Sequence, residues 1–259
     1  MRLKSVLLSL SAAAAMHAGV AHANLIVNGN FESTTNGTNK QLSYGTSSAS
    51  NRTTLTGWTS YNGSDGGYNF VLNAATATTS ASVLQLRGTN NGFSGSSDGG
   101  NFFASDPLYY PGVLYQYVNG LTVGSTYTVT FEYALAQQTN FSGPNVDDYW
   151  QVGLGTSTAG PSQATTALSI ADGGFSGWKN ATMTFTATGV NQALWFLAKG
   201  SSTGAPPFML LDNVSMNAAS TTNPSSAVSE PSSLSMLLGG LGLVGALAYR
   251  RRGVARKPA

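Results

Sequence analysis

Short segments in which apolar and polar residues alternate follow one another along most of the chain. The clearest covers residues 126–136, where the apolar residues from Tyr127 to Tyr133 share one face and threonines share the other with Glu132. This period of two is typical of a half-buried strand in an antiparallel sheet. Further strands are predicted over residues 68–72, 82–86, 113–118, 150–154, 181–187, 193–198 and 208–216. No segment between the two ends shows sustained helical periodicity, so the pattern predicts an all-β chain folded as an antiparallel β-sandwich or jelly roll.

The first of these segments, residues 24–32, is also expected to be a strand. Its alternation places Leu25, Val27 and Phe31 on one face, with Gly29 marking a bulge or a close approach of two backbones.

Polar stretches separate the predicted strands. Residues 33–54 and 88–100 are rich in Ser, Thr, Asn and Gly and are expected to be loops. Residues 217–227 contain mostly Ala, Ser, Thr, Asn and Pro, which predicts a flexible linker. The sandwich is therefore expected to occupy residues 24–216.

Both ends of the chain differ from this pattern. Residues 1–23 combine a charged start, an apolar run and the small-x-small sequence Ala21-His22-Ala23, which predicts a secretory signal peptide cleaved after Ala23. Residues 234–249 are apolar and rich in glycine, and a helix of this length would span about 24 Å, the low end for a bilayer. The basic tail 250–259 follows, and its arginines fit retention on the cytoplasmic side.

Removing both ends excludes several kinds of chemistry. The chain has no cysteine, and its two histidines, His17 and His22, lie in the predicted signal peptide. A Ser-His-Asp triad, a cysteine nucleophile, a zinc site of the usual kind and a disulfide scaffold are therefore excluded. Residues 24–228 contain five basic and nine acidic residues, a net charge of −4, so no basic patch for nucleic acid is expected.

The C-terminal end resembles the PEP-CTERM sorting signal of Gram-negative bacteria. Glu230-Pro231 matches the family motif, with Ser229 in place of its first proline, and the short apolar helix and Arg250, Arg251 and Arg252 follow in the expected order. The resemblance implies a sorting signal over residues 228–259, transient anchoring in the inner membrane and removal by an exosortase, leaving the protein at the cell surface or in the extracellular matrix. The alternative is an ordinary, permanent membrane anchor.

Residues 24–216 resemble a galactose-binding-like jelly roll of the carbohydrate-binding-module type. The resemblance rests on Asn28–Glu32, Trp58, Asp98–Asn101, Gly120–Gly124 and Leu211–Ser215, taken in that order. It implies a structural calcium ion held by Glu32 and Asp212, with Gly29 or Asn30 as backbone ligands.

The sequence itself supports a partner for Asp212. Asp212 is in phase with Leu210 and Val214, so its carboxylate is expected to face the apolar side of its strand, where it needs a cation or hydrogen-bond donors. The alternative is that Asp212 accepts backbone hydrogen bonds while Glu32 faces water.

Aromatic residues in or beside the predicted loops are candidates for stacking on sugar rings. They are Trp58, Tyr61, Tyr68, Tyr109, Tyr110, Trp150 and Trp178. Nearby amides and carboxylates could bind sugar hydroxyls. The competing interpretation is that these rings belong to the core, as most aromatics of β proteins do.

No catalytic site is expected. Asp147-Asp148 with Glu132 is the nearest approach to the paired carboxylates of a glycosidase, but adjacent residues of a strand point to opposite faces. The sequence therefore predicts an exported, non-catalytic module that binds extracellular polysaccharide. The alternatives are a structural component of a biofilm or floc matrix without a discrete ligand and, more remotely, a glycan hydrolase.

Overall fold

The computed structural model describes residues 23–45, 49–158, 160–200 and 206–219. Within these ranges no helix is long and apolar enough to span a membrane. The predicted signal peptide, the apolar run 234–249 and the sorting signal lie outside the described residues, as does the predicted linker after Ala219.

The described chain is all-β, as predicted. Its strands are β1 (Lys40–Leu42), β2 (Arg52–Thr53), β3 (Thr59–Tyr61), β4 (Asn69–Asn73), β5 (Asn101–Ser105), β6 (Val113–Asn119), β7 (Thr126–Gln137), β8 (Asn145–Gly155), β9 (Ser162–Ala164), β10 (Leu168–Ile170), β11 (Lys179–Thr186), β12 (Asn191–Lys199) and β13 (Pro207–Ala218). Strand β13 continues two residues beyond the predicted end of the sandwich.

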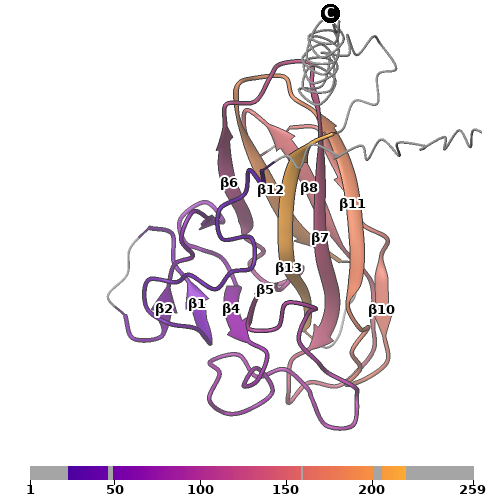
Figure 1. Cartoon of the computed structure of the whole chain (residues 1–259). Helices are drawn as coiled ribbons and strands as arrows, with labels where there is room; N and C mark the ends of the chain where they lie inside the picture. The colour runs from indigo at the N-terminus through magenta and orange to yellow at the C-terminus, as the bar shows by residue number, and fades with distance from the viewer. Residues whose placement is uncertain (1–22, 46–48, 159, 201–205, 220–259) are drawn as a thin grey trace, which may run out of the picture. The chain divides into compact units, whose positions relative to one another are not determined.

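The strands form two sheets arranged as a sandwich (Figure 1). One sheet has the order β11-β7-β13-β5-β4-β1-β2 and the other β10-β8-β12-β6-β3, with β9 paired to β8. The pairings are antiparallel except that of β1 with β2. The predicted antiparallel sandwich is thus confirmed.

The main core fills the space between the sheets. Trp150 is fully buried at its centre, 5.8 Å from Phe103 and 6.3 Å from Phe196 between ring centroids. Its indole Nε1–H donates a 3.0 Å hydrogen bond to the Leu210 carbonyl, which joins β8 of one sheet to β13 of the other. This hydrogen bond aligns β8 of one sheet with β13 of the other.

A second core lies on the outer face of the seven-stranded sheet. Phe70, Phe102, Phe208 and Leu210 pack there under the connection between β4 and β5, which contributes buried leucines such as Leu84. Because both faces of this sheet are covered, β5 is buried along its whole length, and its central residues 102–104 are consecutively apolar instead of alternating.

The predicted strand over residues 24–32 is wrong. Asn28 and Phe31 have φ values of 53° and 55°, so the chain turns there, leaving Val27 58% exposed while Ile26 and Phe31 are buried. The segment still lies along β13, because the Val214 N–H donates to the Gly29 carbonyl at 2.9 Å. The expected close approach at Gly29 is present.

Two other sequence expectations need correction. Residues 82–86 do not form a strand and make only a bridge between Leu86 and Gln138, because they cover the second core instead of joining a sheet. The expected loop 33–54 contains β1 and β2, whose ladders with each other and with β4 involve too few residues to show an alternation.

We predict that Gly29→Ala destabilises the protein by about 2 kcal/mol or more, the cost of overpacking at a rigid contact. A β-carbon at residue 29 would overlap the backbone carbonyl of Val214. Denaturant unfolding measures the change. Gly189→Ala is the matched control, because a β-carbon there meets only ordinary contacts of 3.8 Å. Equal unfolding midpoints for the two variants would contradict the prediction.

Candidate functional site

Asp212 is fully buried and pairs with Glu132 of β7, directly before the register of the β13–β7 ladder shifts. Asn213 has a φ of 53° and the register of β13 shifts there, so Asp212 shares the outer face with Leu210 whereas Val214 belongs to the main core. The predicted common phase with Val214 is therefore wrong. The Asp212 carboxylate accepts hydrogen bonds from Ser96 Oγ and, at 2.8 Å, from the Asn213 N–H. Burial raises its pKa to about 7, and the charges of Asp98 and Glu132 add to the effect.

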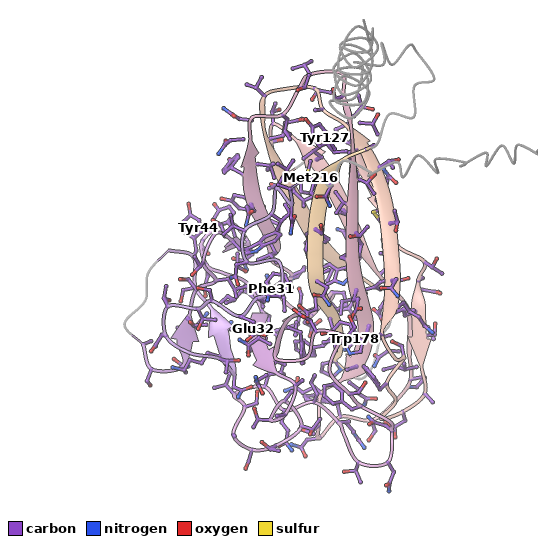
Figure 2. The ribbon with its side chains drawn as sticks, in the orientation of Figure 1. Phe31, Glu32, Tyr44, Tyr127, Trp178 and Met216 are labelled. Carbon is purple, nitrogen blue, oxygen red and sulfur yellow. The ribbon has the colours of Figure 1, made fainter. Side chains whose placement is uncertain are left out.

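Two further carboxylates bind the same loop, residues 96–101. Glu132 accepts hydrogen bonds from the N–H and the hydroxyl of Ser97, at 2.8 and 2.5 Å, and Glu32 Oε1 accepts the Asn101 N–H at 2.5 Å. Gly100 has a φ of 61°, which favours glycine, and its lack of a side chain lets the Glu32 carboxylate approach the loop backbone. Figure 2 labels Glu32 beside Phe31, on the segment that runs along the sheet. The loop thus connects the two ends of the sandwich chain through side-chain oxygens.

The side-chain atoms of these residues that could bind a metal ion are oxygens, which are the ligands that a hard cation prefers. Within the described ranges, however, no three His, Cys, Asp or Glu residues converge to hold an ion, so backbone carbonyls and hydroxyls would complete any such site. Asn30 lines a polar depression of about 360 Å³ with Gly29, Asp98 and Asn213. Glu32 is exposed and Asp212 accepts a backbone N–H, which are also features of the alternative without an ion.

A pocket with aromatic walls lies on another surface. It has a volume of about 360 Å³ and is lined by Gln41, Asn62, Ser64, Asp65, Gly67, Tyr68, Tyr109 and Tyr110. Tyr68 and Tyr109 meet edge to face at 5.1 Å, and Tyr109 and Tyr110 at 5.3 Å. Tyr109 is 59% exposed and Tyr110 65% exposed, so both rings have faces available to a ligand.

The backbone around these tyrosines is held in place. Asp106 is buried, and its Oδ1 accepts the Leu108 and Tyr109 N–H groups at 2.8 and 2.9 Å. Tyr110 has a φ of 48°, and its carbonyl accepts the Tyr68 N–H at 2.8 Å. Burial raises the pKa of Tyr68, with the charge of Asp106 adding to the effect. The pocket is therefore preorganised.

A second group of tyrosines lies around the end of β3, which leads into the turn 62–67 of the pocket. The ring of Tyr61, the last residue of β3, lies 4.6 Å from that of Tyr44 between centroids. On the neighbouring strand β6, the rings of Tyr115 and Tyr117 are 5.6 Å apart. Tyr44 is 53% exposed and Tyr117 60% exposed. Tyr61 directly precedes Asn62 of the pocket lining, so this second group begins one residue away from the pocket.

The sequence identified only some of these tyrosines. It named Tyr61, Tyr68, Tyr109 and Tyr110 but not Tyr44, Tyr115 or Tyr117. The outward position of Tyr115 and Tyr117 follows from their alternation with the buried Leu114 and Val118 on β6. Tyr44 lies in a polar loop, and no sequence signal marks its position.

The tryptophans proposed as sugar ligands lie elsewhere. Trp58 and Trp150 belong to the main core, and their indole N–H groups bind the carbonyls of Asn28 and Leu210, so no ring face is available to a ligand. Trp178 is half-buried against the second core and donates to the Ser94 carbonyl at 3.0 Å. It lies far from Tyr44 in Figure 2, on a different surface.

A polar cleft of about 890 Å³ lies between residues 85–91, 139–140 and 169–176, with Thr78 also in its lining. Arg87 and Asp172 approach to 4.0 Å, and hydrogen bonds from Gly143 and Gln137 lower the pKa of Asp172. Among the described residues that line it, the aromatic one is Phe175, which packs 5.1 Å from Phe93. The cleft offers hydrogen bonds but no free ring for stacking.

The carboxylates considered for catalysis occupy different environments. Glu132 binds Ser97, Asp147 is exposed, and Asp148 is fully buried. Asp147 has a φ of 58°, which bends β8 at this position. None of these three groups lines any of the three pockets described above.

Several solved structures are similar to the chain. The structure of TmCBM61 in complex with beta-1,4-galactotriose is 15% identical with a TM-score of 0.39, covering 76% of this chain and 99% of that chain. The CBM22-1 xylan-binding domain from Paenibacillus barcinonensis Xyn10C is 12% identical with a TM-score of 0.34, covering 78% and 97%. A CBM4 structure is 15% identical with a TM-score of 0.34, covering 74% and 99%. These neighbours are carbohydrate-binding modules, but at such TM-scores their ligands carry no argument for this chain.

The comparison by sequence identifies the C-terminal segment. No curated protein matches the chain. Residues 227–252 match the PEP-CTERM protein-sorting motif, which confirms the resemblance seen in Glu230-Pro231 and the arginine cluster. The chain therefore carries a PEP-CTERM sorting motif, which indicates a secreted protein sorted by an exosortase-type system.

Proposed function

We propose that the protein is an exported, non-catalytic polysaccharide-binding module whose binding site is the tyrosine-lined pocket of Tyr68, Tyr109 and Tyr110. The observation that carries this proposal is the combination of two exposed tyrosine rings with a polar floor, held on a fixed turn.

The chemistry of the pocket suits a sugar. Flat aromatic rings offer apolar faces that can stack on the C–H face of a pyranose, while their hydroxyls can make hydrogen bonds at the edge. Gln41, Asn62 and Asp65 supply donors and acceptors for sugar hydroxyls, the small number of polar groups that fixes a ligand's orientation. Because the turn is preorganised, binding loses little conformational entropy.

The neighbouring tyrosines favour a chain over a single sugar. A pocket of about 360 Å³ is at the small end of ligand sites. The group of Tyr44, Tyr61 and Tyr117 begins next to Asn62 of the pocket and can contact further units of a polysaccharide.

We predict that Tyr109→Ala weakens binding to a polysaccharide by roughly 30-fold, because loss of an aromatic hot spot costs about 2 kcal/mol. Affinity electrophoresis of the full chain against a panel of bacterial and plant polysaccharides measures the effect. Phe141→Ala is the control, since Phe141 is also an exposed ring, 42% accessible, but lies outside both tyrosine groups.

The same experiment separates the proposal from the structural alternative. Binding that survives both Tyr109→Ala and Tyr117→Ala would place the ligand elsewhere. A protein that binds no polysaccharide, while its deletion abolishes biofilm or floc, is instead a matrix component without a discrete ligand.

We also propose that Asp212 and Glu32 hold a structural calcium ion, with the Gly29 and Asn30 backbone nearby. The support is the full burial of Asp212 together with Asp98 and Glu132 as acidic neighbours. An ion would relieve the mutual repulsion of these carboxylates and connect the first segment to β13.

We predict that chelation lowers the unfolding free energy of the wild-type chain more than that of Asp212→Asn. A ligand that binds only the folded state stabilises it by about 2.7 kcal/mol at a concentration 100 times its Kd. Thermal unfolding with calcium or EGTA measures the difference, and Asp147→Asn, an exposed carboxylate, is the control. An identical chelator effect in wild type and Asp212→Asn would exclude this site.

The proposed route to the cell surface has two processing steps, removal of the signal peptide after Ala23 and cleavage of the C-terminal signal near Ser229 after transient anchoring by residues 234–249. We predict that mass spectrometry of the protein from its native host finds Asn24 at the N-terminus and a C-terminus close to Ser229. An intact cluster from Arg250 to Arg252 would mean a permanent anchor instead.

A further inference from the structure

Asp148 is a buried carboxylate without a partner. It is 0% exposed, and neither of its oxygens makes a hydrogen bond. An ionised carboxylate in such a place is strongly unfavourable unless a cation or several donors compensate it. The proposed sugar site does not use this side chain, so its burial needs a separate explanation.

The position of Asp148 follows from its neighbours. The rings of Trp150 and Phe103 pack against each other in the main core. Asp148 lies two residues before Trp150 on β8, and Ser105 lies two residues after Phe103 on β5, so both side chains also point into the interior. Gly200 places the start of β8 beside the end of β5, since a β-carbon there would overlap Asp148 Oδ1 and lie 3.2 Å from Pro107. Ser105, Asp106 and Asp148 therefore line one end of the sandwich interior.

Two further buried oxygens without a hydrogen bond belong to the strands at this end. Ser105 Oγ is fully buried without a hydrogen bond, and so is Asn69 Oδ1, whose residue pairs with Ser105 across β4 and β5. Asp106 is 1% exposed, and its charge is close enough to raise the pKa of Asp148 further after burial has raised it. Two carboxylates and two neutral oxygens thus surround one region.

No basic side chain of the described residues compensates this charge. The ion pairs there are Arg52–Asp65 and Arg87–Asp172, which involve neither Asp106 nor Asp148. Carboxylate and amide oxygens, which accept, predominate in this cluster, and the Ser105 hydroxyl oxygen can accept or bind a cation. A cation therefore suits these groups better than a buried water, which needs both donors and acceptors around it.

We propose that Asp148, Asp106 and Ser105 bind a hard divalent cation, Ca²⁺, inside the end of the sandwich. Carboxylate, hydroxyl and amide oxygens are the ligands that calcium takes, and its flexible coordination number accommodates a mixed set. This site is distinct from the one proposed at Asp212, whose acidic neighbours are Asp98 and Glu132.

The site lies directly behind the proposed sugar-binding pocket. Asp106 Oδ1 accepts the backbone N–H groups of Leu108 and Tyr109, so an ion on Asp106 also stabilises the turn that presents Tyr109 and Tyr110. This coupling rests on the proposed function, whereas the ion site itself does not.

The test uses the full-length chain carrying Asp212→Asn, which removes the other proposed ion site. We expect Ca²⁺ to raise its Tm by several degrees, and Tb³⁺ to show luminescence when Trp150, two residues from Asp148, is excited. Adding Asp148→Asn should abolish both effects. In chelator, Asp148→Asn should unfold at the same temperature or higher, because it removes a buried charge without changing the side-chain volume.

Two further variants complete the test. Asp147→Asn should keep the full Ca²⁺ response, since Asp147 is exposed and asparagine tolerates its positive φ. Ser105→Ala should weaken Ca²⁺ binding about tenfold by removing one neutral ligand. The proposal is overturned if Asp212→Asn shows no Ca²⁺ response, or if adding Asp148→Asn leaves that response and the Tb³⁺ signal unchanged. Neither readout involves polysaccharide, so a failure of the sugar-binding proposal is seen separately.

Discussion

The hydrogen bond from Trp150 to the Leu210 carbonyl crosses the interior from one sheet to the other. It lets a large aromatic ring occupy the centre of the core without leaving its N–H unsatisfied, and it fixes which residues of β8 face which residues of β13. The polar ends of the sandwich depend on this alignment. With Trp150 beside Phe103, Asp148 necessarily falls beside the end of β5, and the turn that carries Tyr109 starts from there.

Buried carboxylates recur at two places in this sandwich, and the same physical constraint acts at both. Asp212 and Asp148 are each withdrawn from water next to other acidic residues, and burial raises the pKa of each to about 7. Asp212 has hydrogen bonds from Ser96 and Asn213, whereas Asp148 has none. A chain without cysteine cannot use disulfides to secure its first segment and its turns. Oxygen-ligated cations are a physically consistent way for such a chain to do so.

Most of the long strands could be predicted from the sequence because their alternation reports burial directly. Strands β6, β7, β11 and β12 fall within a few residues of their expected ranges. Strands β1 and β2 were missed because they are too short to alternate, whereas the two wrongly predicted strands share another cause, which is that alternation cannot tell a sheet face from any other buried surface. Leu84 and Leu86 alternate because they cover the second core, and Ile26 and Phe31 are buried by a turning segment rather than by a strand.

The exposed tyrosines could be predicted only in part from the sequence. By itself the sequence determined the all-β class, the absence of His and Cys chemistry between the two ends, and the sorting motif, because composition and short linear motifs do not depend on folding. Only the tertiary structure decided which aromatics are exposed. Trp58 and Trp150 entered the core, while Tyr44, Tyr61 and Tyr117 met on one surface from three separate segments. Burial and long-range proximity arise from the packing of two sheets, and no local pattern encodes which face a given ring will take.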